Sequence, residues 1–121
     1  MNILQTIVDR KKEEIKLAKS KVNESTLVQT VLFDRKCFSF SEYIIKPELS
    51  GIIAEFKRKS PSKPTINLHA DITQVTTGYT SAGASALSVL TDVDFFGGNV
   101  EDIKQVRSVN QIPILRKDFV I

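Results

Sequence analysis

Apolar and polar positions follow a helical period over the first part of the chain. The apolar residues recur every three or four positions and Lys and Glu fill the opposite face, which predicts one amphipathic helix over residues 2 to 21. The apolar positions are Ile3, Leu4, Ile7, Val8, Ile15, Ala18 and Val22. A second helix is expected over residues 25 to 36, opened by Ser25 or a neighbour. Residues 38 to 45 form a short apolar and aromatic segment, of undefined type, that ends before Pro47.

From Gly51 onward the pattern changes to short apolar runs separated by helical segments. The runs cover residues 51 to 57, 84 to 91 and 112 to 121. Helices are expected between them, over residues 71 to 82 with Asp71 as the N-cap, and over residues 99 to 109 with acidic residues in the first turn. The order is therefore β-α-β-α-β, which predicts parallel strands joined by right-handed crossover helices.

Two architectures are compatible with this order of elements, an open doubly wound sheet and a (β/α)8 barrel. An open sheet that binds nucleotides commonly carries G-x-G-x-x-G or a G-x-x-x-x-G-K-[ST] loop after its first strand. Neither pattern occurs in the chain. The usual support for a nucleotide-binding open sheet is therefore missing.

Charged residues stand at the carboxyl ends of two of the predicted strands. Alternation places Ile53, Glu55 and Lys57 on one face of the first strand, and Ile52, Ala54 and Phe56 on the other. In the third strand Pro113, Leu115 and Lys117 share a face. Barrel enzymes place catalytic residues at this end of the strands. Two inward lysines would repel each other unless an anion lies between them, either Glu55 or a carboxylate or phosphate of a substrate.

The strand-end lysines, and several residues in the loops that follow the strands, also have a purely structural interpretation. A lysine at a strand end is commonly just exposed to solvent. The Ser60-Pro-Ser-Lys63 stretch fits either an anion-binding loop or ordinary turn chemistry. Phe95 and Phe96 could form a lid or an aromatic clamp, although core packing also suits Phe95. Asp118 is expected on the face opposite Lys117, where it would pair with Arg116 or cap a loop.

Composition and charge narrow the classes of function. The net charge of +3 is too small to indicate nucleic-acid binding, although residues 1 to 63 carry 13 basic and 8 acidic side chains. The single cysteine, Cys37, cannot form an intramolecular disulfide, and His69 has no metal-ligand partners at suitable spacing, which favours a reducing cytoplasm. Neither a signal-peptide core nor a membrane span is recognisable.

Three segments, in order and at suitable spacing, resemble the indole-3-glycerol phosphate synthase family. They are IAEFKRKSPSK at residues 53 to 63, LTDxxFFxG at residues 90 to 98 and PILRKDF at residues 113 to 119. They are similar to the family's first, second and third barrel strands. The preceding helices are similar to the family's N-terminal extension, which lies over the top of the barrel. The resemblance implies a (β/α)8 barrel, with residues 1 to 48 as the helical extension and residues 49 to 121 as the first three strands and intervening helices.

The resemblance also implies a function. It implies a carboxy-lyase of tryptophan biosynthesis that closes the indole ring of 1-(2-carboxyphenylamino)-1-deoxyribulose 5-phosphate, releasing carbon dioxide and water without metal or organic cofactor. Lys117 matches the family's general acid, Lys57 a lysine that contacts substrate anions and acts in the later dehydration, and Glu55 the acidic residue that positions or assists it. Ser60, with Lys59 or Lys63, falls where the family binds substrate anions. The residues that match the anthranilate-side pocket are Ser88, Leu90 and Phe96.

The chain ends after about three of the eight strands that this resemblance implies, and so it is expected to be inactive by itself. The isolated chain is expected to associate through its open sheet edges, to pair with the remainder of the barrel, or to stay partly disordered. Two other functions stay open. One is another phosphosugar-binding barrel, such as phosphoribosylanthranilate isomerase, and the paired lysines and the helical extension argue against it. The other is a small non-catalytic module that binds nucleic acid or another acidic partner, for which no aromatic-lined basic face is apparent.

Overall fold

The computed structural model describes residues 2–121, and these residues form two compact units. One unit contains residues 2–37 together with 119–121, and the other contains residues 38–118. Among the described residues, no helix is both long enough and apolar enough to cross a membrane.

The first unit consists of two helices followed by turns. Helix α1 covers Ile3–Lys21, and its N-cap Asn2 accepts a hydrogen bond from the Gln5 amide. This agrees with the predicted amphipathic helix. Helix α2 covers only Glu24–Val28, with Asn23 as its N-cap, and residues beyond it form successive turns. The predicted helix over residues 25 to 36 is therefore wrong in its length.

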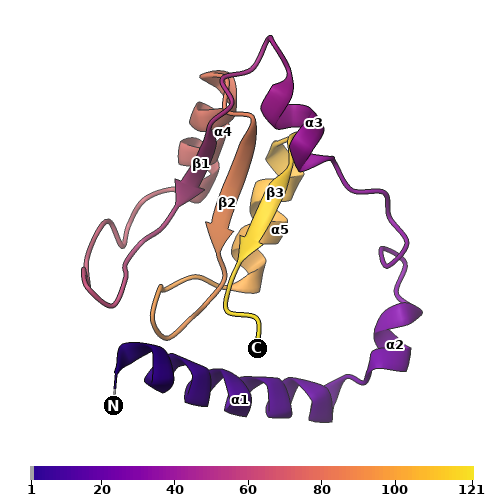
Figure 1. Ribbon diagram of the computed structural model, residues 1–121, viewed down its shortest axis with the longest axis vertical. Helices are drawn as coiled ribbons and strands as arrows, with labels where there is room; N and C mark the ends of the chain where they lie inside the picture. Colours follow the sequence, from indigo (N-terminus) through magenta and orange to yellow (C-terminus); the bar gives the residue numbers. More distant parts are fainter. Residues whose placement is uncertain (1) are drawn as a thin grey trace. The chain divides into compact units, whose positions relative to one another are not determined.

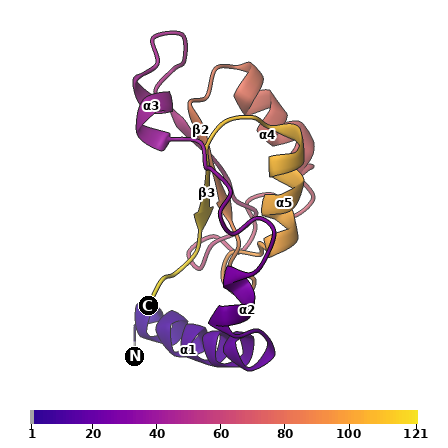
Figure 2. The same ribbon diagram turned by 90° about the vertical axis from the view of Figure 1, so that its right-hand side faces the viewer.

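The second unit is a three-stranded parallel sheet with helices on one face. Its strands are β1 (Ile53–Phe56), β2 (Ala86–Leu90) and β3 (Ile114–Lys117), in the order β1-β2-β3. Helices α4 (Ile72–Ser81) and α5 (Val100–Val109) connect them. The three strands run in the same direction (Figure 1), and the turned view shows α4 and α5 together on one face (Figure 2). The predicted β-α-β-α-β order is confirmed.

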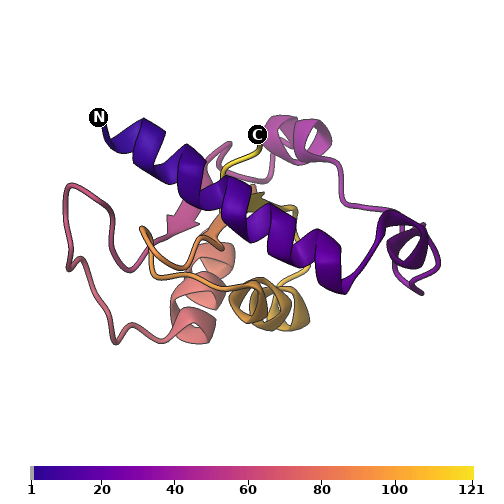
Figure 3. The same cartoon turned by 90° about the horizontal axis from the view of Figure 1, so that it is seen from below.

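The core lies between that face of the sheet and the two helices. Phe56, Leu87 and Val89 from the strands pack with Ile72 of α4 and Val106 of α5. The predicted apolar face of the first strand therefore packs under the helices. Seen from the carboxyl ends of the strands, both helices again lie on the same side of the sheet, and the long loop after β1 extends beyond it (Figure 3).

The N-cap predicted for the first crossover helix, Asp71, is confirmed. The Asp71 carboxylate accepts hydrogen bonds from the amides of Thr73 and Gln74 at the start of α4. Asn99 caps α5 in the same way. The segment of undefined type forms a short helix, α3 (Phe40–Ile45), capped by Ser39.

Candidate active site

A carboxylate lies between two ammonium groups on the sheet face opposite α4 and α5. Glu55 Oε1 lies 2.9 Å from Lys117 Nζ, and its Oε2 lies 3.4 Å from Lys57 Nζ. The Ser88 hydroxyl donates a 3.0 Å hydrogen bond to the same carboxylate. The anion that two inward lysines require is therefore Glu55, which contacts each lysine with a different oxygen.

Strand register explains why these four side chains meet. Glu55 of β1 is aligned with Ser88 of β2, so their side chains leave the same face at the same level. Leu90 of β2 is aligned with Lys117 of β3, two positions nearer the carboxyl end. The long side chain of Lys117 reaches back across β2 to Glu55. The site thus draws on all three strands.

The surroundings of Glu55 keep it ionised. Burial raises the pKa of this carboxyl, but the hydrogen bonds from Lys117 and Ser88, with the positive charges of Lys117 and Lys57, outweigh burial and lower the pKa below its usual 4.5. The stabilisation that follows from the lowered pKa is present above the unfolded-state pKa, and it is lost as the pH falls through the folded-state pKa.

A titration of the Glu55 carboxyl carbon by NMR, assigned with a Glu55→Gln variant, tests this arrangement. We expect a midpoint below 4.5. Lys117→Met should raise the midpoint, because it removes both a hydrogen bond and a positive charge. A midpoint at or above the usual value in the unsubstituted protein would contradict the geometry described for Glu55.

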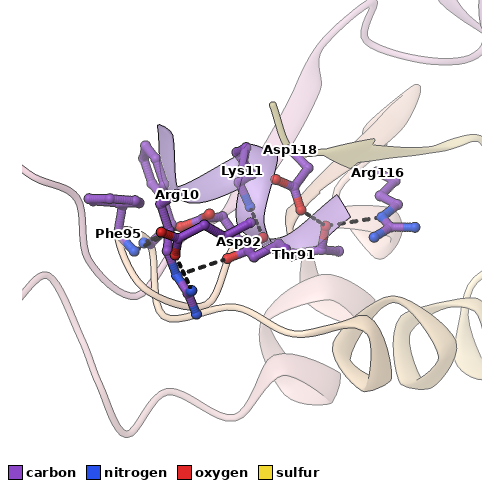
Figure 4. A network of polar contacts seen from close by, with 10 residues as sticks. Arg10, Lys11, Thr91, Asp92, Phe95, Arg116 and Asp118 are labelled. Atoms are coloured by element: carbon purple, nitrogen blue, oxygen red, sulfur yellow. Dashed lines mark hydrogen bonds and ion pairs between the residues drawn. The ribbon is translucent and has the colours of Figure 1, made fainter. Parts of the chain in front are cut away.

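The loop after β2 carries two aromatic side chains, and one of them, Phe96, borders this cluster. The buried Asp92 accepts hydrogen bonds from the amides of Phe95, at 2.8 Å, and Phe96, at 3.2 Å. Figure 4 shows Asp92 and Phe95 together in this loop. Both phenylalanines are half-buried, and Lys57 Nζ lies 6.0 Å from the centroid of the Phe96 ring. That distance is at the limit of a cation–π contact, so Phe96 borders the lysine.

The loop after β1 forms a tight turn at Ser60. The Ser60 amide donates to the Lys63 carbonyl at 2.9 Å, and the Lys63 amide donates back to the Ser60 carbonyl and hydroxyl. The structural interpretation of the Ser60–Lys63 stretch, a hydrogen-bonded turn, is therefore confirmed. The Lys59 ammonium donates to the main-chain carbonyl of Asp94 in the loop after β2, at 3.3 Å. Beside β1 lies a pocket of about 330 Å³, lined in part by Lys57, Asn67 and Tyr79.

The structure brings some of the predicted site residues together and leaves others apart. Glu55, Lys57, Lys117 and Ser88 make direct contacts, and Phe96 borders Lys57. Leu90 is buried near the end of β2, two positions beyond Ser88. Neither Ser60 nor Lys59 has a hydrogen bond or ion pair to Glu55, Lys57 or Lys117, and these two residues lie in the loop beyond the strand end.

Two polar contacts near the site were missed by the sequence analysis. One is the ion pair between Arg58 and Asp102, which are 44 positions apart. The other is a chain of hydrogen bonds in which Arg116 Nε donates to the Thr91 hydroxyl and that hydroxyl donates to Asp118 (Figure 4). Asp118 was expected to pair with Arg116 or to cap a loop, and in the structure the Thr91 hydroxyl joins these two side chains. No local pattern signals such distant partners.

Comparison with known proteins agrees with the geometry. The family model described as "Indole-3-glycerol phosphate synthase" matches residues 4–121. Curated proteins of the same name are 41% identical over 99% of this chain in Bacteroides thetaiotaomicron, 38% over 99% in Syntrophobacter fumaroxidans and 42% over 98% in Bacillus cereus strain G9842. These matches cover 46%, 46% and 44% of the relatives, so the chain spans about half their length. On this evidence the chain belongs to the indole-3-glycerol phosphate synthase family.

Proposed function

We propose that the full-length protein containing these residues is an indole-3-glycerol phosphate synthase. It would close the indole ring of 1-(2-carboxyphenylamino)-1-deoxyribulose 5-phosphate and release carbon dioxide and water. The observation that carries this proposal is the placing of Lys57 and Lys117 on either side of Glu55, at the carboxyl ends of parallel strands. Residues 1 to 48 would form the helical extension and residues 49 to 121 the first part of the barrel.

The roles proposed for the three charged groups follow from the charge that develops in such a reaction. As the aryl carbon attacks the ribulose carbonyl, the carbonyl oxygen becomes negative, and a nearby ammonium both stabilises this charge and supplies a proton. Lys117 suits this role because its side chain is half-exposed and remains available to a substrate. Glu55 holds the two ammonium groups in place, and Lys57 would contact substrate anions and serve the later dehydration.

The remaining substrate contacts are proposed from where these residues lie, at or beyond the carboxyl ends of β1 and β2. Phe96 and Leu90 would border the anthranilate ring, and Ser60 with Lys59 would contact anionic groups of the substrate. Ser88 would support this pocket chiefly through Glu55, since its hydroxyl already donates to that carboxylate. We propose a reaction that needs no added metal or organic cofactor.

The test is an assay of the purified full-length protein with the carboxyphenylamino-deoxyribulose phosphate. Formation of the indole product, followed by its fluorescence and unaffected by a chelator, would support the proposal. If the protein instead isomerises phosphoribosylanthranilate and forms no indole, the proposed reaction is wrong although the barrel assignment stands.

We further propose that residues 1–121 expressed alone would self-associate. Within the described sheet β1 and β3 each pair on one side only, and Ile53 and Leu115 are 48% and 44% exposed. Unpaired strand edges and exposed apolar side chains favour association between chains. Size-exclusion chromatography with light scattering should show oligomers, and a monodisperse monomer that unfolds cooperatively would contradict this expectation.

A further inference from the structure

Thr91, the residue directly after β2, is bonded to three consecutive residues at the end of β3. Its amide donates a hydrogen bond to the Lys117 carbonyl at 3.1 Å. Its hydroxyl contacts the side chains on either side of that lysine, accepting from Arg116 Nε at 3.1 Å and donating to Asp118 Oδ2 at 2.8 Å (Figure 4). One residue, itself 3% exposed, thus holds the segment that carries the proposed general acid.

The chemistry of the three side chains fixes the direction of both hydroxyl bonds. A guanidinium can only donate hydrogen bonds and a carboxylate can only accept them, whereas a hydroxyl does both. The Thr91 hydroxyl therefore directs its one proton to Asp118 and a lone pair to Arg116. Because threonine is branched at Cβ, its side chain has few rotamers, and the backbone at the end of β2 decides where the hydroxyl points.

The hydroxyl of Thr91 lies on the side of the sheet away from the charged cluster. Side chains alternate along a strand, and Ser88 shares a face with Glu55, so alternation places Thr91 on the other face. The Lys117 ammonium bonds to Glu55 at 2.9 Å, whereas Thr91 bonds to the neighbours of Lys117. Thr91 can therefore act on that ammonium only by fixing the backbone from which the lysine side chain extends.

The backbone of Lys117 depends on this anchor because Lys117 is the last residue of β3. It is aligned with Leu90, where β2 also ends. The bond from the Thr91 amide to the Lys117 carbonyl is the next rung of the ladder, and the two hydroxyl bonds brace that rung. A shift of about 1 Å in the position of a reacting group can cost on the order of a hundredfold in rate.

We propose that Thr91 is a positioning residue, which holds the backbone of Lys117 where its ammonium reaches the reacting carbonyl of the substrate. This inference rests on the proposed function, because the position of Lys117 matters to the reaction only if this lysine is the general acid. The Thr91 hydroxyl faces away from the proposed substrate site. Its loss should therefore lower kcat and leave KM nearly unchanged.

Thr91→Val in the full-length enzyme tests this role, because valine keeps the shape and the backbone amide and removes the hydroxyl. We expect kcat to fall about tenfold, with KM within about twofold of the unsubstituted enzyme. Thr91→Ser keeps the hydroxyl and should keep kcat within about threefold. A Thr91→Val enzyme with unchanged kcat, or a Thr91→Ser enzyme as slow as Thr91→Val, would overturn the proposal.

Thr76→Val is the matched control on α4. The Thr76 hydroxyl is also buried and makes two bonds, donating to the Ile72 carbonyl at 2.7 Å and accepting from Asn110 Nδ2 at 3.1 Å. Its loss should lower the thermal stability about as much as Thr91→Val does, and leave kcat unchanged. An equal fall in kcat in the two variants would show a general loosening of the fold and would count against positioning by Thr91.

A double-variant cycle shows whether Thr91 acts through Lys117. In the presence of the lysine Thr91→Val should slow the enzyme, and in a Lys117→Met background it should have no further effect on kcat. The same fall in both backgrounds would mean that Thr91 acts by another route, and the proposal would be wrong. Arg116 is exposed, so Arg116→Met removes one partner of the hydroxyl with little risk to folding. It should lower kcat about threefold, and an unchanged kcat would contradict the anchor.

Titration of Glu55 gives a readout that needs no activity. Burial raises the pKa of Glu55, and the hydrogen bond and charge of Lys117 lower it, so a displaced ammonium should leave the pKa higher. Thr91→Val should therefore raise the midpoint, as Lys117→Met does, and Thr76→Val should not. If the full-length protein forms no indole product, the proposed function is wrong, and the titration still decides whether Thr91 sets the position of Lys117. If the protein is active and the midpoint in Thr91→Val is unchanged, the function stands and the positioning role is wrong.

Discussion

Lys117→Ala should lower kcat of the full-length enzyme by about a thousandfold, within the range expected for loss of a positioned general acid together with its charge. KM should change little, because the proposed binding groups lie on other elements. The carboxylate that Lys117 contacts keeps two partners, Lys57 and Ser88, so the variant does not leave Glu55 without hydrogen bonds or charge neutralisation. Steady-state kinetics with fluorescence detection of the indole product measure both constants.

Three further variants test the separate roles proposed for Lys117 and Lys57. Lys117→Arg keeps the positive charge but gives up its proton poorly, so it should remain far slower than the unsubstituted enzyme. Lys57→Ala should affect kcat and KM together, because Lys57 is proposed to contact substrate anions as well as to act in dehydration. Lys104→Ala, which removes an exposed lysine of α5, should leave both constants unchanged. Equal, mild losses of kcat in Lys117→Ala and Lys57→Ala would contradict the proposed roles.

The part of the fold that follows from short-range rules could be predicted from the sequence. Short apolar runs located the three strands, and the cap residue Asp71 located the start of α4. The crossover rule then gave parallel strands. The structure confirms them and shows that they lie in sequential order. Members of the family are (β/α)8 barrels, so the predicted fold class is correct for the chain as their N-terminal portion.

The error over residues 25 to 36 has a physical reason. A short helix in water needs packing against other elements, because its intrinsic stability is marginal. After Gln29 the chain offers β-branched residues with low helix propensity, and Val31 and Leu32 are 97% and 66% exposed. The Thr30 hydroxyl also bonds to the Leu27 carbonyl, and the backbone continues as turns. The sequence could not show that residues after Gln29 lack the packing partners that a helix would need there.

In the candidate site, too, the residues that follow from local sequence patterns were predicted, and the contacts between distant residues were not. Alternation placed Glu55, Lys57 and Lys117 on faces that could meet, and the need for an anion between two lysines indicated either Glu55 or an anionic group of a substrate. Neither argument required knowledge of distant contacts. The Arg58–Asp102 pair depends on where α5 begins relative to the end of β1, and nothing near either residue encodes this. Ser88 was named as a pocket residue, whereas strand register directs its hydroxyl to Glu55.

Gly98 closes the loop after β2 at a point where no side chain fits. A Cβ placed on this residue would lie 2.0 Å from the Leu90 carbonyl oxygen and 2.6 Å from the Leu90 carbonyl carbon. Both atoms belong to the backbone of a buried strand, so no rotamer change relieves the overlap. The Gly98 amide meanwhile donates to the Asp92 carbonyl at 2.8 Å, in the turn that also orders Phe95 and Phe96.

Gly98→Ala should therefore destabilise the full-length protein by about 3 kcal/mol, the scale of strain from an overpacked interior, and should raise KM by displacing Phe96. Gly78→Ala is the matched control, since its Cβ would meet nothing within 4 Å in the middle of α4. There the same change should stabilise the protein by about 0.5 to 1 kcal/mol, because alanine loses less backbone entropy in a helix than glycine does. Denaturant unfolding measures both free energies. A Gly98→Ala variant as stable as the unsubstituted protein would mean that the loop after β2 shifts freely away from Leu90, and Asp92 could not then be holding Phe96 beside Lys57.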